Sequence, residues 1–473
     1  MFVGRHEEQE LLRNAYRSAH SRLIVIYGRR RIGKTFLVHE TFAYHFTFHH
    51  AGVSNGTRKE QLFAFAASLK DAGLKPDHIP ESWMEAFELL KDLIRISKES
   101  RKVIFIDELS WMDTHRSDLL KALEIFWNGW ASSRKDVVLI LCSSVTSWML
   151  NKVIHNKGGL YHRVTEHIYL QPFTLSECEE YATAAGLGMR RFQILQVYMI
   201  LGGVPFYWTF LRPSRSPAQN IDAMFFSPQA DLKEEFTNLI HSLFHASEDY
   251  ISIIRTLAKN RNGMTRDDIV RHSGLIGSGH FSEKMEELEK CGFIRIYDPM
   301  INQKKHRIYQ LTDPFTLFHF HFLTSKTNDP HFWSNQINTP RLNTWNGLAF
   351  ERVCLLHIDQ MRHALGISGV LTQACSWICR ENADFGIQGS QIDLLLMRKD
   401  QVINLIEMKF SSGQYAVTKK DYEDLERKRN DLYRSTRISD AIHFTMVTPF
   451  GLADNSYAKE IQSTVTMNDL FHA

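Results

Sequence analysis

Residues 22 to 35, RLIVIYGRRRIGKT, join a short apolar run to a glycine-containing loop. From Gly28 to Thr35 the loop matches G-x-x-x-x-G-K-[ST], and the residues that follow it have helical spacing. A strand, this loop and a helix, in that order, form the context that a phosphate-binding loop requires. The stretch therefore predicts an α/β fold with a nucleotide site at one edge of its sheet.

The loop contains the residues that a triphosphate needs. Gly28 and Gly33 let the backbone curl so that its amides point at phosphate oxygens, and the dipole of the following helix adds positive potential. Lys34 is expected to reach the β- and γ-phosphates, and Thr35 is expected to ligate Mg²⁺. We therefore expect ATP and Mg²⁺ as cofactors.

The rest of the N-terminal part alternates between apolar runs and helix-length stretches. Further apolar runs occupy residues 44 to 50, 103 to 107, 137 to 142 and 167 to 173. Amphipathic stretches separate them, which is typical of a parallel sheet covered by helices. We therefore expect a P-loop ATPase core over residues 1 to 173.

Two acids end the run at residues 103 to 107. Asp107 and Glu108 come at the carboxyl end of a buried strand, where open α/β sheets bind ligands. Asp107 is expected to hold the Mg²⁺ shell, and Glu108 to polarise the attacking water. The alternative is that both are ordinary acids at a strand end.

Two further positions complete the expected site. Ser143, or its neighbour Ser144, follows the next strand and could sense the γ-phosphate, although serines there also serve as turn residues. Arg163 precedes the last strand and could reach a neighbouring subunit's nucleotide as an arginine finger, which would require a homo-oligomer. A surface or salt-bridge arginine is the alternative.

With FVGRHEE at residues 2 to 8 and LGGVPFYW at residues 201 to 208, these motifs resemble a known family. It comprises the archaeal and bacterial AAA+-related (STAND-like) ATPases whose chains end in a restriction-endonuclease-like domain. The resemblance implies that Val3 and Gly4 lie near the adenine. The sequence departs from the pattern with CSS, where many relatives have a glycine before the serine, and with LYHR, where they often have LYGR.

Strand signals vanish after the predicted ATPase core. Helical spacing dominates residues 174 to 245, which predicts a helical lid. Residues 246 to 323 then contain three predicted helices and two strands, the order of a winged helix-turn-helix. Residues 324 to 341 are rich in turn formers and are expected to be a linker.

The polar tip between those two strands is basic. Lys304, Lys305, His306 and Arg307 together could grip a DNA backbone without reading its sequence. The third helix is predominantly acidic and suits a major groove poorly. A packing or protein-contact module is therefore the alternative to a DNA-binding one.

Residues 391 to 410, QIDLLLMRKDQVINLIEMKF, predict two strands within a C-terminal α+β unit of residues 342 to 473. If residues 399 to 401 form the turn, Asp393 lies opposite Glu407, and Lys409 projects on the same side as Glu407. Buried carboxylates are unfavourable unless they are paired or hold a metal, and two such oxygen donors suit Mg²⁺, with Mn²⁺ as an alternative. A turn with an even number of residues would separate the two acids.

This order of D and then E-x-K resembles the PD-(D/E)XK phosphodiesterases, although Ile392 stands where the motif's name has proline. The resemblance implies that Glu351, in the preceding helix, is a further metal ligand. The metal would activate a water, and Lys409 would orient that water or neutralise the phosphate oxygen. Lys428 and Arg429, in the helix predicted at residues 419 to 437, are possible phosphate contacts.

These sites give two functional hypotheses. The first is an ATP-hydrolysing protein whose nucleotide state gates a metal-dependent phosphodiesterase acting on DNA; the family resemblance implies defence against foreign DNA. The second is a nucleotide-switched DNA- or protein-binding regulator whose C-terminal fold is a docking module.

The length and composition of the chain limit its domain number and the class of protein to which it can belong. A chain of 473 residues predicts about three domains at ~150 residues each. A net charge of +3 neither demands nor excludes nucleic acid. Six scattered cysteines and the lack of an export signal indicate a cytoplasmic protein, and no apolar run approaches the ~18 residues of a membrane span.

Overall fold

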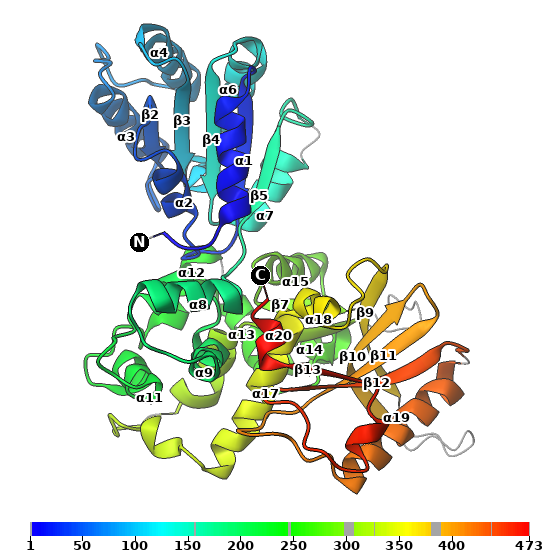
Figure 1. Cartoon of the computed structure of the whole chain (residues 1–473). Coiled ribbons are helices and arrows are strands. Elements are labelled where there is room, and N and C mark those ends of the chain that lie inside the picture. Colours follow the sequence, from blue (N-terminus) through cyan, green and yellow to red (C-terminus); the bar gives the residue numbers. More distant parts are fainter. Residues whose placement is uncertain are drawn as a thin grey trace. The chain divides into compact units, whose positions relative to one another are not determined.

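The computed structural model describes residues 2–155, 158–244, 247–297, 307–325, 327–379, 389–436 and 438–472. The chain divides into two compact units, Met1–Pro172 and Phe173–Ala473 (Figure 1). Across the described ranges, every helix is too short or too polar to cross a membrane.

The first unit is built on a five-stranded sheet with the order β2-β3-β4-β1-β5. Its strands are β1 (Arg22–Tyr27), β2 (Phe48–Ala51), β3 (Lys102–Asp107), β4 (Val137–Ser143) and β5 (Glu166–Tyr169). All neighbouring strands pair in parallel, so the predicted parallel sheet is confirmed. The strand predicted from residue 44 begins only at Phe48, because Ala43 and Tyr44 turn the chain with positive φ.

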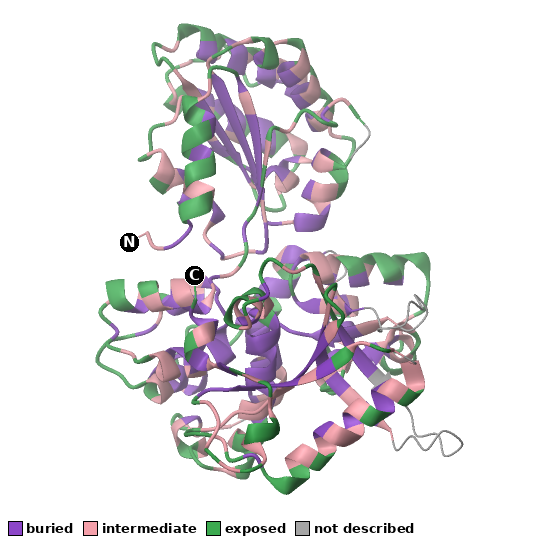
Figure 2. Cartoon of the chain, turned by 45° about the vertical axis from the view of Figure 1, so that its right-hand side comes forward, coloured by how far each residue is buried: buried purple, intermediate pink, exposed green. Residues whose placement is uncertain are grey.

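Helices cover both faces of this sheet. They are α1 (His6–Arg17), α2 (Lys34–Thr41), α3 (Arg58–Asp71), α4 (Trp83–Ile96), α5 (Leu109–Met112), α6 (Leu119–Gly129) and α7 (Thr146–Met149), with the short η1 (Ala131–Ser133) and η2 (Leu150–Ile154). Phe105 packs with α1 and α2, whereas Ile104 and Ile106 pack with α3, α4 and α6. Because both faces are buried (Figure 2), the central strands β1, β3 and β4 are nearly continuous apolar runs.

The second unit begins with helices and a small sheet. The first helices are α8 (Leu175–Ala184), α9 (Arg191–Leu201), α10 (Pro205–Trp208), α11 (Pro217–Ile221), η3 (Asp222–Phe226) and α12 (Glu235–Leu243). They are followed by α13 (Ser247–Ala258), β6 (Met264–Thr265), α14 (Arg266–Ser273), α15 (Gly279–Lys290), β7 (Ile294–Tyr297), β8 (Ile308–Leu311), α16 (Pro314–Phe318) and η5 (His319–Leu323). The three strands pair antiparallel in the order β6-β8-β7. Lys304, Lys305 and His306, at the predicted basic tip, lie outside the described residues.

The segment interpreted as a linker is partly packed. Trp333 is only 8% exposed, and η6 (Ser334–Gln336) follows it. The Asp222 carboxylate accepts hydrogen bonds from the amides of Trp333 (2.7 Å) and Ser334 (3.2 Å). Part of the predicted linker is therefore packed against η3, and the division of the chain at residues 324 to 341 stays a prediction.

The C-terminal part forms a mixed sheet with the order β13-β12-β11-β10-β9. Its elements are α17 (Pro340–Leu356), α18 (Ile358–Ala364), β9 (Thr372–Cys379), β10 (Ser390–Arg398), β11 (Val402–Met408), α19 (Lys419–Thr436), β12 (Ala441–Thr448), η8 (Ala458–Glu460), β13 (Ser463–Thr466) and α20 (Met467–Leu470). Leu425 and Leu432 of α19 pack against the sheet. The division of residues 174 to 473 into separate domains stays a prediction.

The hairpin of β10 and β11 has the predicted register. Leu394 pairs with Ile406, and Met397 pairs with Ile403, in an antiparallel ladder. The same register, continued by one residue pair beyond Leu394 and Ile406, would set Asp393 opposite Glu407. The chain turns between Arg398 and Val402, so the odd-numbered turn is confirmed.

Candidate functional site

The phosphate-binding loop runs from the end of β1 to the start of α2. Its backbone takes positive φ at Gly28 (144°), Arg31 (70°) and Gly33 (88°). A Cβ on Gly28 would lie 2.3 Å from the carbonyl oxygen of Leu170, so a larger residue would displace the loop. Both predicted glycines therefore lie where the backbone conformation favours glycine.

Lys34 is the first residue of α2 and points back into this loop. Its side chain is buried, and its ammonium donates to the carbonyl oxygens of Gly28 (2.9 Å) and Arg29 (2.8 Å). The first turn of α2 contains no acidic residue, so nothing in that turn offsets the positive end of the helix dipole. The ammonium of Lys34, the amides of the loop and the positive end of α2 together favour the binding of an anion.

Thr35 and Asp107 meet from different elements. The Thr35 hydroxyl donates to Asp107 Oδ2 at 2.6 Å, and Asp107 Oδ1 accepts from the Glu108 amide at 2.8 Å. Asp107 is 4% exposed at the end of β3. A hydroxyl and a buried carboxylate at the carboxyl edge of a parallel sheet are oxygen donors of the kind that Mg²⁺ prefers. These two residues fit the predicted Mg²⁺ site.

Glu108 has a left-handed backbone with a φ of 47°, which is uncommon for a residue other than glycine. Its Oε2 accepts hydrogen bonds from the Ser144 amide (3.1 Å) and the Ser144 hydroxyl (2.7 Å). The turn after β3 and the turn after β4 therefore fix this carboxylate beside Asp107.

The serine pair after β4 has two different roles. The Ser143 hydroxyl donates to the Ser110 hydroxyl at 2.9 Å and accepts from the Val145 amide. Ser144 is the serine that contacts Glu108, so the structure assigns the position near the acids to Ser144 and not to Ser143. Successive residues of a strand point to opposite faces, and the sequence alone could not choose between them.

Cys142 is a neighbour of this site that the sequence analysis did not select. Its side chain is fully buried at the end of β4, on the sheet face that carries α1 and α2. Burial, and then the negative charge of Asp107, raises the pKa of its thiol well above the ordinary value. Cys142 therefore stays a neutral thiol, and the unusual CSS sequence was the only signal that could have pointed to it.

The remaining predicted site residues are Arg163 and the N-terminal residues Val3 and Gly4. Arg163 is exposed in the turn before β5, and its amide donates to the Leu160 carbonyl oxygen at 3.0 Å. Gly4 is buried with a positive φ, and the Arg5 guanidinium donates to the carbonyl oxygen of Gln171 at 2.5 Å. The finger role of Arg163 and the adenine contacts of Val3 and Gly4 stay predictions.

A second group of charges gathers in the C-terminal sheet. Asp393 accepts a hydrogen bond at 2.9 Å from the side-chain amide of Gln391. Burial, and then the charges of Glu351 and Glu407, raises the pKa of Asp393. The pairing of β10 with β9 also shifts between Ile392 and Leu395, around this acid. Such irregularities re-aim side chains and often lie near functional sites.

Glu407 lies between two ammonium groups. Its Oε2 is 2.8 Å from Lys428 Nζ, and its Oε1 is 3.0 Å from Lys409 Nζ. Burial alone would raise the pKa of Glu407, but Lys428 and Lys409 outweigh it and lower the pKa. Lys428 also lies 3.1 Å from Asp424 and is buried, and a phosphate contact of Lys428 or Arg429 stays a prediction.

Glu351 of α17 is 2% exposed and is bound by arginines. Its Oε2 accepts from the Arg261 guanidinium at 2.8 Å, and its Oε1 is paired with Arg352. Arg352 also donates to the Leu311 carbonyl oxygen at 2.9 Å. Glu351 therefore closes an ion network, buried at Glu351 and Arg352 but half-exposed at Arg261, that joins α17 to the turn before β6 and to the end of β8.

The predicted three-carboxylate metal site is not supported in full. Among the residues described, no three His, Cys, Asp or Glu side chains gather as metal ligands would. Arginines hold both oxygens of Glu351, so this residue is a poor ligand. The charge of Glu407 acts on Asp393 and contributes to its raised pKa, so a cation beside these carboxylates would be favourable. These two residues still fit a divalent cation.

Comparison with known proteins gives one family match over the N-terminal part of the chain and one relative that aligns with most of it. Residues 2–209 match the model of a family described as an ATPase domain predominantly from Archaea. An uncharacterized protein of Methanocaldococcus jannaschii is 25% identical over 436 residues, which cover 90% of this chain and 92% of that protein. An uncharacterized ATP-binding protein of the same organism is 50% identical over 38 residues, covering 8% of this chain and 64% of that protein.

Solved structures give weaker likenesses. A Walker-type ATPase of Pyrococcus abyssi has a TM-score of 0.49 and 16% identity, covering 68% of this chain and 96% of that one. The ORC2 protein of Aeropyrum pernix has a TM-score of 0.40 and 17% identity, covering 67% of this chain and 92% of that one. With TM-scores below 0.5, neither defines the fold of this chain.

Proposed function

We propose that this protein binds and hydrolyses ATP at the loop between β1 and α2. The observation that carries the proposal is one continuous set of contacts: Thr35 to Asp107 at 2.6 Å, and Glu108 to Ser144 at 2.7 Å, next to the buried ammonium of Lys34. The match of residues 2–209 to an ATPase domain supports the same activity.

Each residue has a distinct task in this proposal. Lys34 neutralises charge on the β- and γ-phosphates, and the loop amides and the start of α2 orient them. Thr35 and Asp107 hold Mg²⁺, which when bound offsets the charge that develops on the phosphate. Glu108, fixed by Ser144, orients the attacking water and accepts its proton. Arg163 completes the site from a second subunit if the protein assembles.

Glu108→Gln tests the task of the acid. The amide keeps the size of the side chain and can still bond to Ser144, but it cannot accept a proton. We expect ATP binding to persist while phosphate release falls about 10²- to 10³-fold, the usual contribution of a positioned general base. Asp118→Asn, at a half-exposed acid before α6, serves as the control and should leave both unchanged. Unchanged turnover in Glu108→Gln would remove Glu108 from the mechanism.

A second proposed activity is metal-dependent cleavage of DNA by the C-terminal sheet, gated by the nucleotide state of the first unit. The specific observations in its favour are the hairpin register, which continued by one pair would set Asp393 opposite Glu407, and the 3.0 Å separation of Lys409 Nζ from Glu407 Oε1. Asp393 and Glu407 hold Mg²⁺ or Mn²⁺, and Lys409 orients the attacking water. The helices and strands of residues 247 to 311 act as a winged helix that holds the DNA backbone, and defence against foreign DNA is the biological context.

Asp393→Ala tests this second activity. The full chain is incubated with plasmid DNA, ATP and either Mg²⁺ or Mn²⁺, and strand breaks are followed by electrophoresis. We expect cleavage by the unmodified protein and its loss in Asp393→Ala, because one of the two metal ligands is gone. Asp400→Ala, in the exposed turn of the same hairpin, is the matched control and should cleave normally. ATP-dependent binding of DNA or protein without any strand break would favour the regulator instead.

A further inference from the structure

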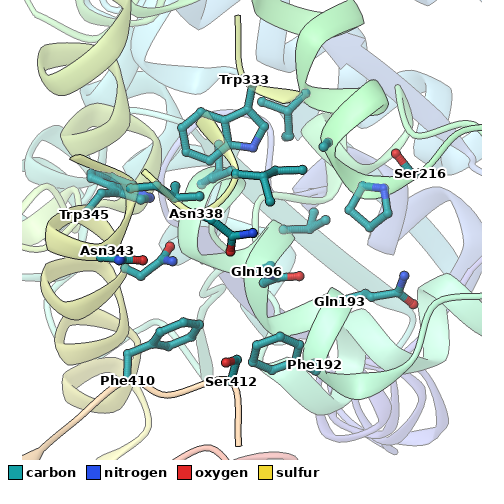
Figure 3. Close-up of a pocket in the computed structure, with 18 of the residues that line it drawn as sticks. Phe192, Gln193, Gln196, Ser216, Trp333, Asn338, Asn343, Trp345, Phe410 and Ser412 are labelled. Carbon is teal, nitrogen blue, oxygen red and sulfur yellow. The ribbon is translucent and has the colours of Figure 1, made fainter. Parts of the chain in front are cut away.

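A cavity of about 570 Å³ lies within the second unit. Its lining residues, between Phe192 and Ser412, come well after the phosphate-binding loop in the sequence. Three distant segments line it: α9 with α11, residues 333 to 346, and residues 410 to 412 at the end of β11 (Figure 3). Its volume is in the range of about 300 to 1,000 Å³ that is usual for small-molecule sites.

The lining combines flat rings with side-chain amides. The rings belong to Phe192, Trp333, Trp345 and Phe410, and the amides to Gln193, Gln196, Asn338, Asn343 and Asn346. In the close-up, the amides of Gln196 and Asn338 lie toward the middle of the hollow, and Phe192 and Phe410 lie together at one end (Figure 3). None of the described lining residues is charged.

Several of these amides have hydrogen-bonding capacity to spare. Within the described part of the chain, the side chains of Gln196, Asn338 and Asn343 make no hydrogen bond, whereas Gln193 accepts one from the Arg190 amide at 2.9 Å. A side-chain amide offers two donors and one acceptor oxygen. A ligand that fills this cavity would therefore meet matched donors and acceptors without having to displace protein contacts.

We propose that this cavity binds an unpaired nucleobase. A base has two flat apolar faces, which stack on aromatic rings, and an edge of alternating donors and acceptors, which side-chain amides pair with in a bidentate manner. The uncharged lining leaves the phosphates outside. The base can come from a free nucleoside or nucleotide, or from an unpaired position in a nucleic acid strand.

The position of the cavity links it to the charges of the C-terminal sheet. Phe410 directly follows Lys409 in the chain, and Phe410 is a lining residue. Where the base belongs to a nucleic acid strand, that strand would pass near Lys409 and its partner Glu407. This link rests on the proposed phosphodiesterase, whereas base binding itself does not.

The test is calorimetric titration of the full chain with the four nucleosides and, separately, with an unstructured oligothymidine and a duplex of equal length. The Lys34→Ala background removes binding at the ATP site, and nucleosides lack the phosphates which that site recognises. The two pocket variants are Gln196→Leu, which keeps the shape without the amide, and Asn338→Gly. Glycine is chosen because Asn338 has a φ of 64°, which alanine would strain. Gln414→Ala, at an exposed amide two residues beyond Ser412, is the control.

We expect at least one nucleoside or the oligothymidine to bind, with affinity about fivefold lower in each pocket variant for one lost hydrogen bond, and unchanged in the control. Binding of nucleosides alone identifies a free nucleoside or nucleotide as the ligand; binding of the single strand but not the duplex identifies a strand. No binding by either probe, or equal losses in the control, would overturn the proposal. A further variant, Asp393→Ala, separates base binding from DNA cleavage. We expect base binding to be unchanged in this variant, whether or not the unmodified protein cleaves DNA.

Discussion

Lys34→Ala is expected to lower kcat/KM for ATP by about 10³- to 10⁵-fold. Two losses combine in this figure: a charged hydrogen bond to the phosphates, worth about 1.5 to 3 kcal/mol, and stabilisation of the developing charge, worth about 2.7 to 4 kcal/mol. Within the described part of the chain, the buried ammonium of Lys34 donates to the carbonyl oxygens of Gly28 and Arg29, so alanine removes few contacts that hold the fold.

Phosphate release and nucleotide binding are measured together for this variant. Lys70→Ala, at an exposed lysine of α3, is the control for removal of a positive charge and should behave as the unmodified protein does. Turnover within a factor of about three of normal in Lys34→Ala would mean that another site hydrolyses ATP, because even one lost charge-assisted bond costs more than that.

Glu351→Ala is expected to destabilise the second unit by about 3 to 5 kcal/mol, the usual cost of removing one partner of a buried ion pair. The change leaves Arg352, whose side chain is 2% exposed, without its carboxylate, and it removes the partner of Arg261 at 2.8 Å. The free energy of unfolding is measured by urea denaturation.

The control for Glu351 is an ion pair of similar chemistry at the surface. Glu423→Ala removes a carboxylate 3.6 Å from Lys419, and both side chains are mostly exposed. We expect a loss of at most about 0.5 kcal/mol there. A loss below about 1 kcal/mol in Glu351→Ala would contradict the structural role, because a buried unpaired arginine costs more. Reduced metal affinity without reduced stability would restore Glu351 as a metal ligand.

The ATP site could be predicted from the sequence because its signals are local. Gly28, Gly33, Lys34 and Thr35 lie in one loop, and the strand-end rule brings Asp107 to it without knowledge of the fold. The hairpin of Asp393 and Glu407 was equally local, since a single turn sets its register. The sequence therefore predicted contacts within one loop or hairpin. It also predicted contacts between neighbouring strand ends, because the geometry of a parallel sheet fixes where these ends lie.

The contacts that could not be predicted depend on packing between segments that lie far apart in the sequence. Arg261 and Glu351 are 90 positions apart, and no pattern in either segment indicates that they pair. The choice of Ser144 over Ser143 depends on how the turn after β4 bends toward Glu108. The cavity beside Phe410 joins three segments that are each ordinary in sequence, and one of them overlaps the predicted linker.

The central claim is that Lys34, Asp107 and Glu108 form an ATP-hydrolysing site. The most direct measurement is phosphate release from ATP and Mg²⁺ by the purified full chain, run beside nucleotide binding for the unmodified protein, Lys34→Ala and Glu108→Gln. The account predicts turnover in the first, neither strong binding nor turnover in the second, and binding without turnover in the third. Equal phosphate release by all three proteins would contradict it.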